Sequence, residues 1–208
     1  MSAEADTSLL RWRTYGLWAG INLLAFGVLY PLVNWLTSLR ADTFEFYMDI
    51  ERSIPFLPVW IWVYLSINPL FMLPPLFLRA CDMPILGRRM LVATVCGCII
   101  FLLLPARLGF ERVVPDDWQY RFVFGALFRA DGPHNLMPSL HVTYAMLCIF
   151  SFLTGVRGWL AGIAWIMWLV SIMASTVLVH QHHLMDVASG LLLALVITFF
   201  MPSAIAGN

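Results

Sequence analysis

The chain has 208 residues, of which 61% are hydrophobic and only 12% are charged, and its twelve basic and twelve acidic residues cancel. An average soluble protein carries about 25% charged residues, so this composition excludes an ordinary soluble domain and predicts an integral membrane protein. The zero net charge gives no reason to expect nucleic acid as a partner. All twelve basic residues are arginine, which excludes chemistry that depends on lysine.

Six apolar segments follow one another along the chain, each about as long as a helix that spans a bilayer, although the third and sixth are short at about sixteen residues. They cover residues 15–36, 56–78, 90–105, 139–156, 159–179 and 187–202. Several prolines in the second segment predict kinks there, namely Pro58, Pro69, Pro74 and Pro75. No small-residue cleavage site follows the first segment, so it is expected to be retained. We predict an all-α fold, an integral membrane six-transmembrane-helix bundle, as one domain over residues 1–208.

The longest polar stretch, residues 106–137, has aromatic side chains between its charges. This pattern predicts structure at the membrane interface rather than a free loop. Counting six spans places the residues that follow span 3, begin span 4, follow span 5 and begin span 6 on one face. Arg107, Arg112, His141, His182 and Asp186 are therefore expected to emerge together. The arginines divide evenly between the two faces, six on each. If some arginines on the site face serve the chemistry, those that remain favour cytoplasmic termini.

Two short polar motifs carry the chemistry: Pro138-Ser139-Leu140-His141 and His182-His183-Leu184-Met185-Asp186. Ionisable side chains at the ends of apolar spans are costly and are commonly functional. His182 can attack phosphorus as a neutral imidazole, and Asp186, four residues later, can set its tautomer if the segment is helical. His141 can protonate the leaving alkoxide. The motifs predict phosphoryl transfer on a lipid through a phosphohistidine.

The phosphate oxygens also need cations and amide donors. Ser139 and Leu140, at the start of a predicted helix, can supply the amides. Arg107, just past span 3, is the best-placed clamp, and Arg112 comes next, although both could be interfacial side chains that only reach towards water. Further candidates for auxiliary roles are Arg129, Asn135 and His183.

Two other interpretations stay open. His180, His182, His183 and Asp186 could be metal ligands, although a metal enzyme leaves the Pro-Ser-Leu-His motif unexplained. A non-catalytic membrane scaffold would not need His141, His182 and Asp186 together. We therefore expect an enzyme that uses neither a metal nor a cofactor.

At these motifs the chain resembles the type 2 phosphatidic acid phosphatase superfamily, whose second and third signatures are Pro-Ser-Gly-His and Ser-Arg, five residues, His, three residues, Asp. Leu140 in place of glycine, with Asn135 shortly before the motif, is similar to the branch of inositol phosphorylceramide synthase and its bacterial relatives. The resemblance implies a six-helix bundle, a phosphohistidine at His182 and acid–base work by His141. The first signature is absent, and Thr176 stands at the usual arginine of the third.

The expected function is that of a lipid phosphatase or lipid phosphotransferase. The substrate is a lipid phosphate, and the acceptor is water or an alcohol head group, as in a sphingolipid head-group synthase. The expected location is a bacterial inner membrane. There the site faces the periplasm or exterior and the termini lie in the cytoplasm.

Overall fold

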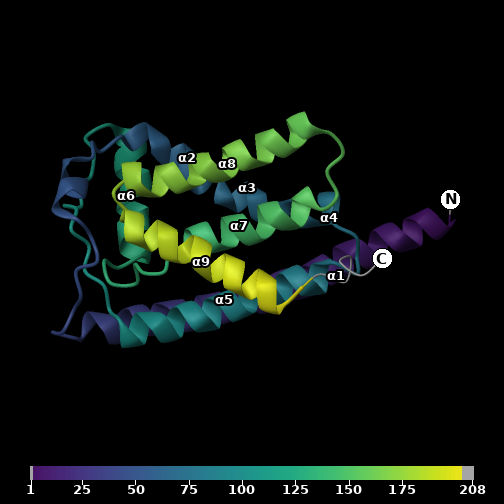
Figure 1. Ribbon diagram of the computed structural model, residues 1–208, viewed down its shortest axis with the longest axis horizontal. Coiled ribbons are helices and arrows are strands. Elements are labelled where there is room, and N and C mark those ends of the chain that lie inside the picture. The colour runs from purple at the N-terminus through teal and green to yellow at the C-terminus, as the bar shows by residue number, and fades with distance from the viewer. Residues whose placement is uncertain (1, 203–208) are drawn as a thin grey trace.

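The computed structural model describes residues 2–202, and this part of the chain is helical with no strand, as predicted (Figure 1). Six helices have more than ten residues: α1 (Ser2–Ser38), α5 (Met83–Leu103), α6 (Trp118–Ala130), α7 (Leu140–Leu153), α8 (Trp159–Leu178) and α9 (Leu184–Phe200). The remaining helices are short: η1 (Asp49–Ser53), η2 (Pro58–Trp60), α2 (Ile61–Leu65), α3 (Ile67–Met72) and α4 (Pro74–Phe77).

Three helical segments are long and apolar enough to cross a membrane, namely Ser8–Ser38, Met83–Leu103 and Trp159–Leu178. Three shorter stretches are also apolar: Pro58–Met72, Leu140–Leu153 and Leu184–Phe200. Large hydrophobic side chains remain exposed on the helices, for example Leu24 at 70% and Phe199 at 79%. Water does not favour so much exposed apolar surface, so these helices indicate a membrane protein.

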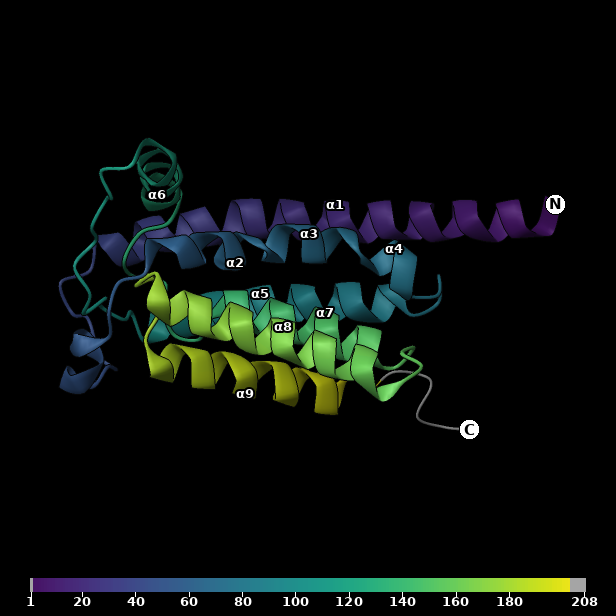
Figure 2. The same ribbon diagram turned by 90° about the horizontal axis from the view of Figure 1, so that it is seen from above.

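The second apolar segment is broken into η2, α2, α3 and α4, as its prolines predicted. Pro69 has no backbone N–H, so the carbonyl of Leu65 loses its helical partner. The Asn68 side chain donates a hydrogen bond to that carbonyl at 2.9 Å. Helix α4 begins at the Pro74-Pro75 pair. The short helices that result follow one another along the molecule, with α3 and α4 in contact with α7 and α2 in contact with α8 (Figure 2).

Two boundaries differ from the sequence prediction. Helix α5 begins at Met83, where Pro84 suits the first turn, and not at residue 90. Arg89 lies within this added part of the helix, where its guanidinium donates two hydrogen bonds to the carbonyl of Met201, at 2.9 and 2.6 Å. Helix α9 begins at Leu184, three residues earlier than expected, so that Asp186 lies in its first turn.

The ends of the helices are arranged as the span count required. The C-terminal ends of α5 and α8 and the N-terminal ends of α7 and α9 lie at the same end of the molecule (Figure 1). Helix α6 crosses that end, so the polar stretch is structured, as predicted (Figure 2). Helix α7 is almost wholly buried among its neighbours, and Leu147, Cys148 and Ile149 have at most 1% exposure. The two sequence motifs therefore meet at one end of a rigid core.

Candidate active site

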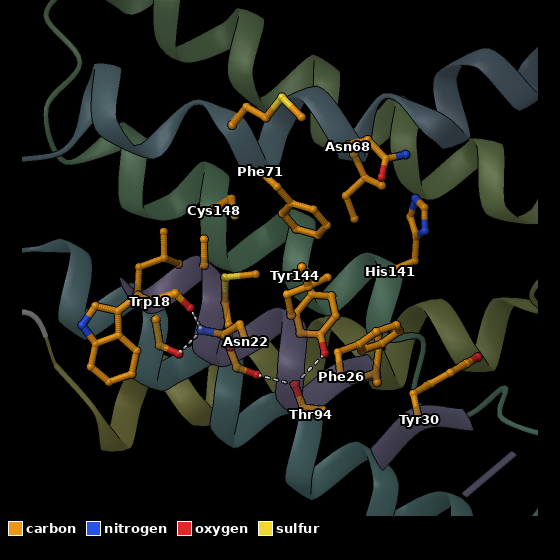
Figure 3. Close-up of a pocket in the computed structure, with 18 of the residues that line it drawn as sticks. Trp18, Asn22, Phe26, Tyr30, Asn68, Phe71, Thr94, His141, Tyr144 and Cys148 are labelled. Carbon is orange, nitrogen blue, oxygen red and sulfur yellow. Dashed lines mark hydrogen bonds between the residues drawn. The ribbon is translucent and has the colours of Figure 1, made fainter. Parts of the chain in front are cut away.

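A cavity of about 610 Å³ runs between α1, α3, α5 and α7. One face of α1 lines it with side chains three or four residues apart, namely Tyr15, Trp18, Asn22, Phe26 and Tyr30. Trp18 marks one end of the cavity, and Tyr30 and His141 mark the other (Figure 3). From Tyr15 to Tyr30 the helix rises by about 22 Å. The cavity is therefore long and largely apolar.

Most of the ionisable side chains of the cavity lie at the end near Tyr30, which we call the polar end. His141, from the first sequence motif, and His182, from the second, both line this end, as do Tyr64, Asp131 and Asn135. The two histidines are 41 positions apart in the chain, so only the packing of α7 against the turn before α9 brings them together. A single cavity thus contains both a largely apolar part, which we call the apolar arm, and the two histidines that were predicted to be catalytic.

His182 is 6% exposed and faces Asp186 on α9. Its Nδ1 lies 3.5 Å from Asp186 Oδ2, which is slightly too long for a formed hydrogen bond. The carboxylate is already fixed, because the same Oδ2 accepts the backbone N–H of His183 at 2.8 Å. Because Nδ1 of His182 faces the Asp186 carboxylate, Nε2 is the ring nitrogen that can contact a ligand in the cavity. His182 lies in the turn before α9 and not in the helix, so the predicted pair faces each other without the helical spacing on which the prediction relied.

A tight turn after α8 sets the position of His182. The backbone N–H groups of Gln181 and His182 both donate to the carbonyl of Thr176, each at 3.0 Å. His180 takes a left-handed conformation with φ of 55° to make this turn. The Thr176 hydroxyl itself donates to the carbonyl of Met173 at 2.8 Å. Thr176, which stands at the arginine of the resembled signature, therefore positions His182 through its backbone carbonyl.

His141 is held by α2. Its Nε2 lies 2.9 Å from the carbonyl of Tyr64, and its ring stacks on the Tyr64 ring with centroids 4.0 Å apart. A carbonyl can only accept, so Nε2 carries the proton of the neutral imidazole and Nδ1 carries the free lone pair. Helix α2 ends at Leu65, whose carbonyl loses its helical partner at Pro69, and it packs mainly against α8. A proton can therefore be taken up or released at Nδ1 without breaking the contact with Tyr64.

Ser139 does not line the cavity, in contrast to its predicted role in binding phosphate. It is fully buried, and its Oγ caps α7 by accepting the N–H of Val142 at 3.4 Å. Its own N–H donates to the carbonyl of Asp186 at 3.0 Å. The next two residues, Leu140 and His141, line the cavity, and their first-turn amides have no hydrogen-bond partner within residues 2–202. Leu140 thus keeps its predicted place, while Ser139 ties the two motifs together.

The contact between α7 and α9 depends on Gly190. A Cβ atom at this position would lie 2.5 Å from the carbonyl oxygen of Ser139. The hydroxyl of Thr143 lies between the helices, 2.9 Å from the carbonyls of both Ser139 and Gly190. The small side chain and this shared hydroxyl hold the two motifs in register.

His183, predicted as an auxiliary site residue, has a structural role. Its Nε2 accepts the N–H of Gly109 at 3.0 Å, so Nδ1 is the donor to Glu51 Oε2 at 3.3 Å. Its ring stacks between Tyr47 and Phe110. Burial lowers the pKa of His183, which favours this neutral form. The residue therefore joins three loops next to the nucleophile and does not face the cavity.

Glu51 is the buried partner of His183 and was not identified from the sequence. It is 1% exposed, and its Oε2 also accepts the N–H of Leu184, at 2.8 Å, in the first turn of α9. Its Oε1 accepts the N–H of Met48 at 3.0 Å. A carboxylate at this position stabilises the N-terminus of the helix that carries Asp186. The other acids of this loop, Glu45 and Asp49, are exposed, so no local pattern distinguishes Glu51.

Neither of the two arginines lines the cavity, but Arg112 contacts a residue that does, whereas Arg107 does not. Arg107 lies on the surface with 67% of its side chain exposed, 3.9 Å from Glu45, and does not line the cavity. Its backbone pairs with Phe44 in a loop contact that directs it away. Arg112 instead lies over the Phe128 ring at 5.0 Å and donates from Nη1 to the Asp131 carbonyl at 2.6 Å. Arg112 does not line the cavity either, but it contacts Asp131, which does.

The other two auxiliary candidates also lie near this end. Arg129 is exposed on the last turn of α6 and does not line the cavity. Asn135 does line it, and its Oδ1 accepts the hydroxyl of Thr37 at 3.0 Å. This contact fixes the loop before α7 to the end of α1, which agrees with the predicted turn role of Asn135.

The histidine cluster is not arranged for a metal. Within residues 2–202 no group of three His, Cys, Asp or Glu side chains is placed to hold an ion. His180 Nε2 lies 3.0 Å from the carbonyl of Ile54, and both ring nitrogens of His183 already have partners. Only His182 and Asp186 of the predicted ligand set face each other at the cavity.

Comparisons with protein-family models, with curated proteins and with solved structures gave no match to this chain.

Proposed function

We propose that the protein is an integral membrane enzyme that transfers a phosphoryl group from a lipid phosphate through a phosphohistidine at His182. In this proposal the apolar segments form six spans. The helix termini near Ser2 and Phe200 lie on the cytoplasmic side, and the end with α6 lies on the exterior side. The resemblance of the two motifs to the type 2 phosphatidic acid phosphatase superfamily supports the same chemistry.

One observation carries the proposal. His141 and His182 lie at the polar end of a cavity whose other walls are apolar and which extends about 22 Å along α1. A lipid phosphate has the matching shape, because its hydrocarbon chain would fill the apolar arm and its phosphate would reach the histidines. A water-soluble substrate would leave the apolar arm without a ligand.

The residues divide the reaction between them. Nε2 of His182 attacks phosphorus while Asp186 stabilises the imidazolium that forms. His141, in its protonated form, donates its Nδ1 proton to the leaving alkoxide and later accepts the proton of the incoming hydroxyl. The free amides of Leu140 and His141 at the start of α7 bind the phosphate oxygens. Arg112 adds positive potential from behind this end.

The test is turnover by the purified protein of a lipid panel containing phosphatidic acid, lysophosphatidic acid and phosphatidylinositol. Free phosphate and new lipids are both measured by mass spectrometry, with and without EDTA. We expect turnover of at least one lipid, unchanged by EDTA and lost in His182→Ala. The matched control is His134→Ala, a half-buried histidine outside the cavity, which should keep activity within about threefold. Full activity of a folded His182→Ala variant, or loss in EDTA restored by zinc, would overturn the proposal.

A further inference from the structure

Asp131 is an acidic side chain at the polar end of the cavity for which the phosphoryl-transfer chemistry has no use. It follows the last residue of α6 and lines the cavity together with His141 and His182. The set of nucleophile, orienting acid and proton donor is complete without it. A carboxylate close to a phosphate site is unfavourable, because like charges repel in a poorly solvated environment. Its presence therefore needs an explanation.

The position of this carboxylate is well defined. Its Oδ1 accepts a hydrogen bond from the hydroxyl of Tyr30 at 2.6 Å, across from α1. Its backbone carbonyl accepts from Arg112 at 2.6 Å. The second carboxylate oxygen, Oδ2, has no hydrogen-bond partner in the described part of the chain. The contacts with Tyr30 and Arg112 thus fix the position of Asp131, while Oδ2 makes no hydrogen bond.

Asp131 accepts a hydrogen bond in this structure, while the pKa of its carboxyl is raised, chiefly by burial. Burial raises the pKa of its carboxyl, while the Tyr30 hydroxyl, His182 and Arg112 act in the opposite direction. The nearest hydroxyl of the protein, that of Tyr30, already donates to Oδ1. In its ionised form the carboxylate can only accept, so a group that binds Oδ2 then brings its own donor proton, as an alcohol does and as ionised phosphate oxygens do not.

We infer that Asp131 binds the acceptor of the phosphoryl group, which is an alcohol whose hydroxyl donates a hydrogen bond to Oδ2. This inference rests on the proposed function and makes the enzyme a phosphotransferase in preference to a phosphatase. The bound hydroxyl oxygen attacks phosphorus as the bond from phosphorus to His182 Nε2 breaks, and the bonding pair returns to Nε2. As the oxygen attacks, its proton leaves the hydrogen bond to Oδ2 and passes to Nδ1 of His141, which gave its own proton to the leaving group in the first half of the reaction.

The test compares wild type with Asp131→Asn, which keeps the size of the side chain but places an amide where a carboxylate oxygen was. The donor is phosphatidic acid labelled with ³²P, and the acceptors are glycerol, myo-inositol and a short-chain ceramide in mixed micelles. Three quantities are measured: the burst of label on the protein, the release of phosphate and the transfer to each alcohol. Asp116→Asn is the matched control, since that carboxylate is fully exposed at the same end of the molecule.

We expect wild type to transfer label to at least one alcohol. In Asp131→Asn the kcat/KM for that alcohol should fall at least tenfold, while the burst and the KM for phosphatidic acid stay within about twofold. Label should pass to water instead, and Asp131→Glu should restore part of the transfer. Asp116→Asn should behave as wild type.

Unchanged transfer in Asp131→Asn, or wild type that releases only phosphate with every alcohol, would overturn the inference while leaving the phosphohistidine intact. If the burst in Asp131→Asn needs a higher concentration of phosphatidic acid than in wild type, Asp131 binds the donor lipid. That result would also overturn the inference. Absence of any burst in wild type would instead overturn the proposed function itself.

Discussion

At the scale of single residues, the account separates side chains that face the cavity from those that support them. His141 and His182 face it, whereas Ser139 and His183, from the same two motifs, are turned into hydrogen bonds of the protein. The sequence motifs alone could not distinguish these roles. A polar residue in a motif is equally consistent with contact to substrate and with a helix cap.

The two arginines give a test at this scale. Arg112→Ala should lower kcat/KM for the lipid phosphate roughly 10- to 100-fold, because positive potential behind the polar end stabilises the charge that develops on the phosphoryl group. Arg112→Lys should restore little, since lysine lacks the planar group that lies over Phe128. Arg107→Ala should stay within about threefold of wild type, because its exposed side chain is screened by water. Equal losses in steady-state kinetics of both alanine variants would contradict the assignment.

At the scale of elements, the spacing of apolar segments predicted the main helices and the convergence of their ends. Hydrophobicity decides which stretches avoid water, and counting them fixes which ends meet. The start of α5 could not be predicted in this way, because the partner of Arg89 is the carbonyl of Met201, more than a hundred residues later. The burial of Glu51 depends on an equally distant contact with Leu184 and His183. Contacts of this kind leave no local pattern in the sequence.

The packing of α7 on α9 gives a stability prediction. Gly190→Ala should lower the free energy of unfolding by about 1–3 kcal/mol, because its Cβ would press on the backbone of Ser139, which cannot move aside like a flexible side chain. Activity should fall as well, since the two motifs are separated. Gly20→Ala in α1, where a Cβ meets nothing within 4 Å, is the matched control and should be neutral or slightly stabilising. The measurement is the midpoint of thermal unfolding of each variant in detergent. Equal shifts of the midpoint in Gly190→Ala and Gly20→Ala would refute the role of Gly190.

The loop that carries Glu51 gives a second prediction for an element. Glu51→Ala leaves the N–H of Leu184, the N–H of Met48 and Nδ1 of His183 without an acceptor, at a cost of about 1–3 kcal/mol for each buried donor. The midpoint of thermal unfolding should fall clearly. Asp49→Ala, at an exposed position of the same short helix, should leave it unchanged. A Glu51→Ala variant as stable as wild type would show that this carboxylate does not hold the start of α9.

At the scale of the whole molecule, the apolar helices, the long cavity and the histidines at its polar end form one arrangement. The apolar arm accounts for the lipid part of the proposed substrate, and the ends of α7 and α9 account for the phosphate part. The composition predicted the membrane class, and the two motifs predicted the histidine pair. The cavity itself could not be predicted, because its walls come from four helices distant in sequence.

The most direct measurement of the central claim is detection of the covalent intermediate. The purified protein is mixed with ³²P-labelled phosphatidic acid, or with the lipid of the panel that is turned over fastest, and quenched in alkali within the first turnover. We expect label on the protein that is stable in alkali and lost in acid, that maps by mass spectrometry to His182 and that is absent in His182→Ala. Steady turnover of the lipid with no label on His182, or with label on another residue, would contradict the account.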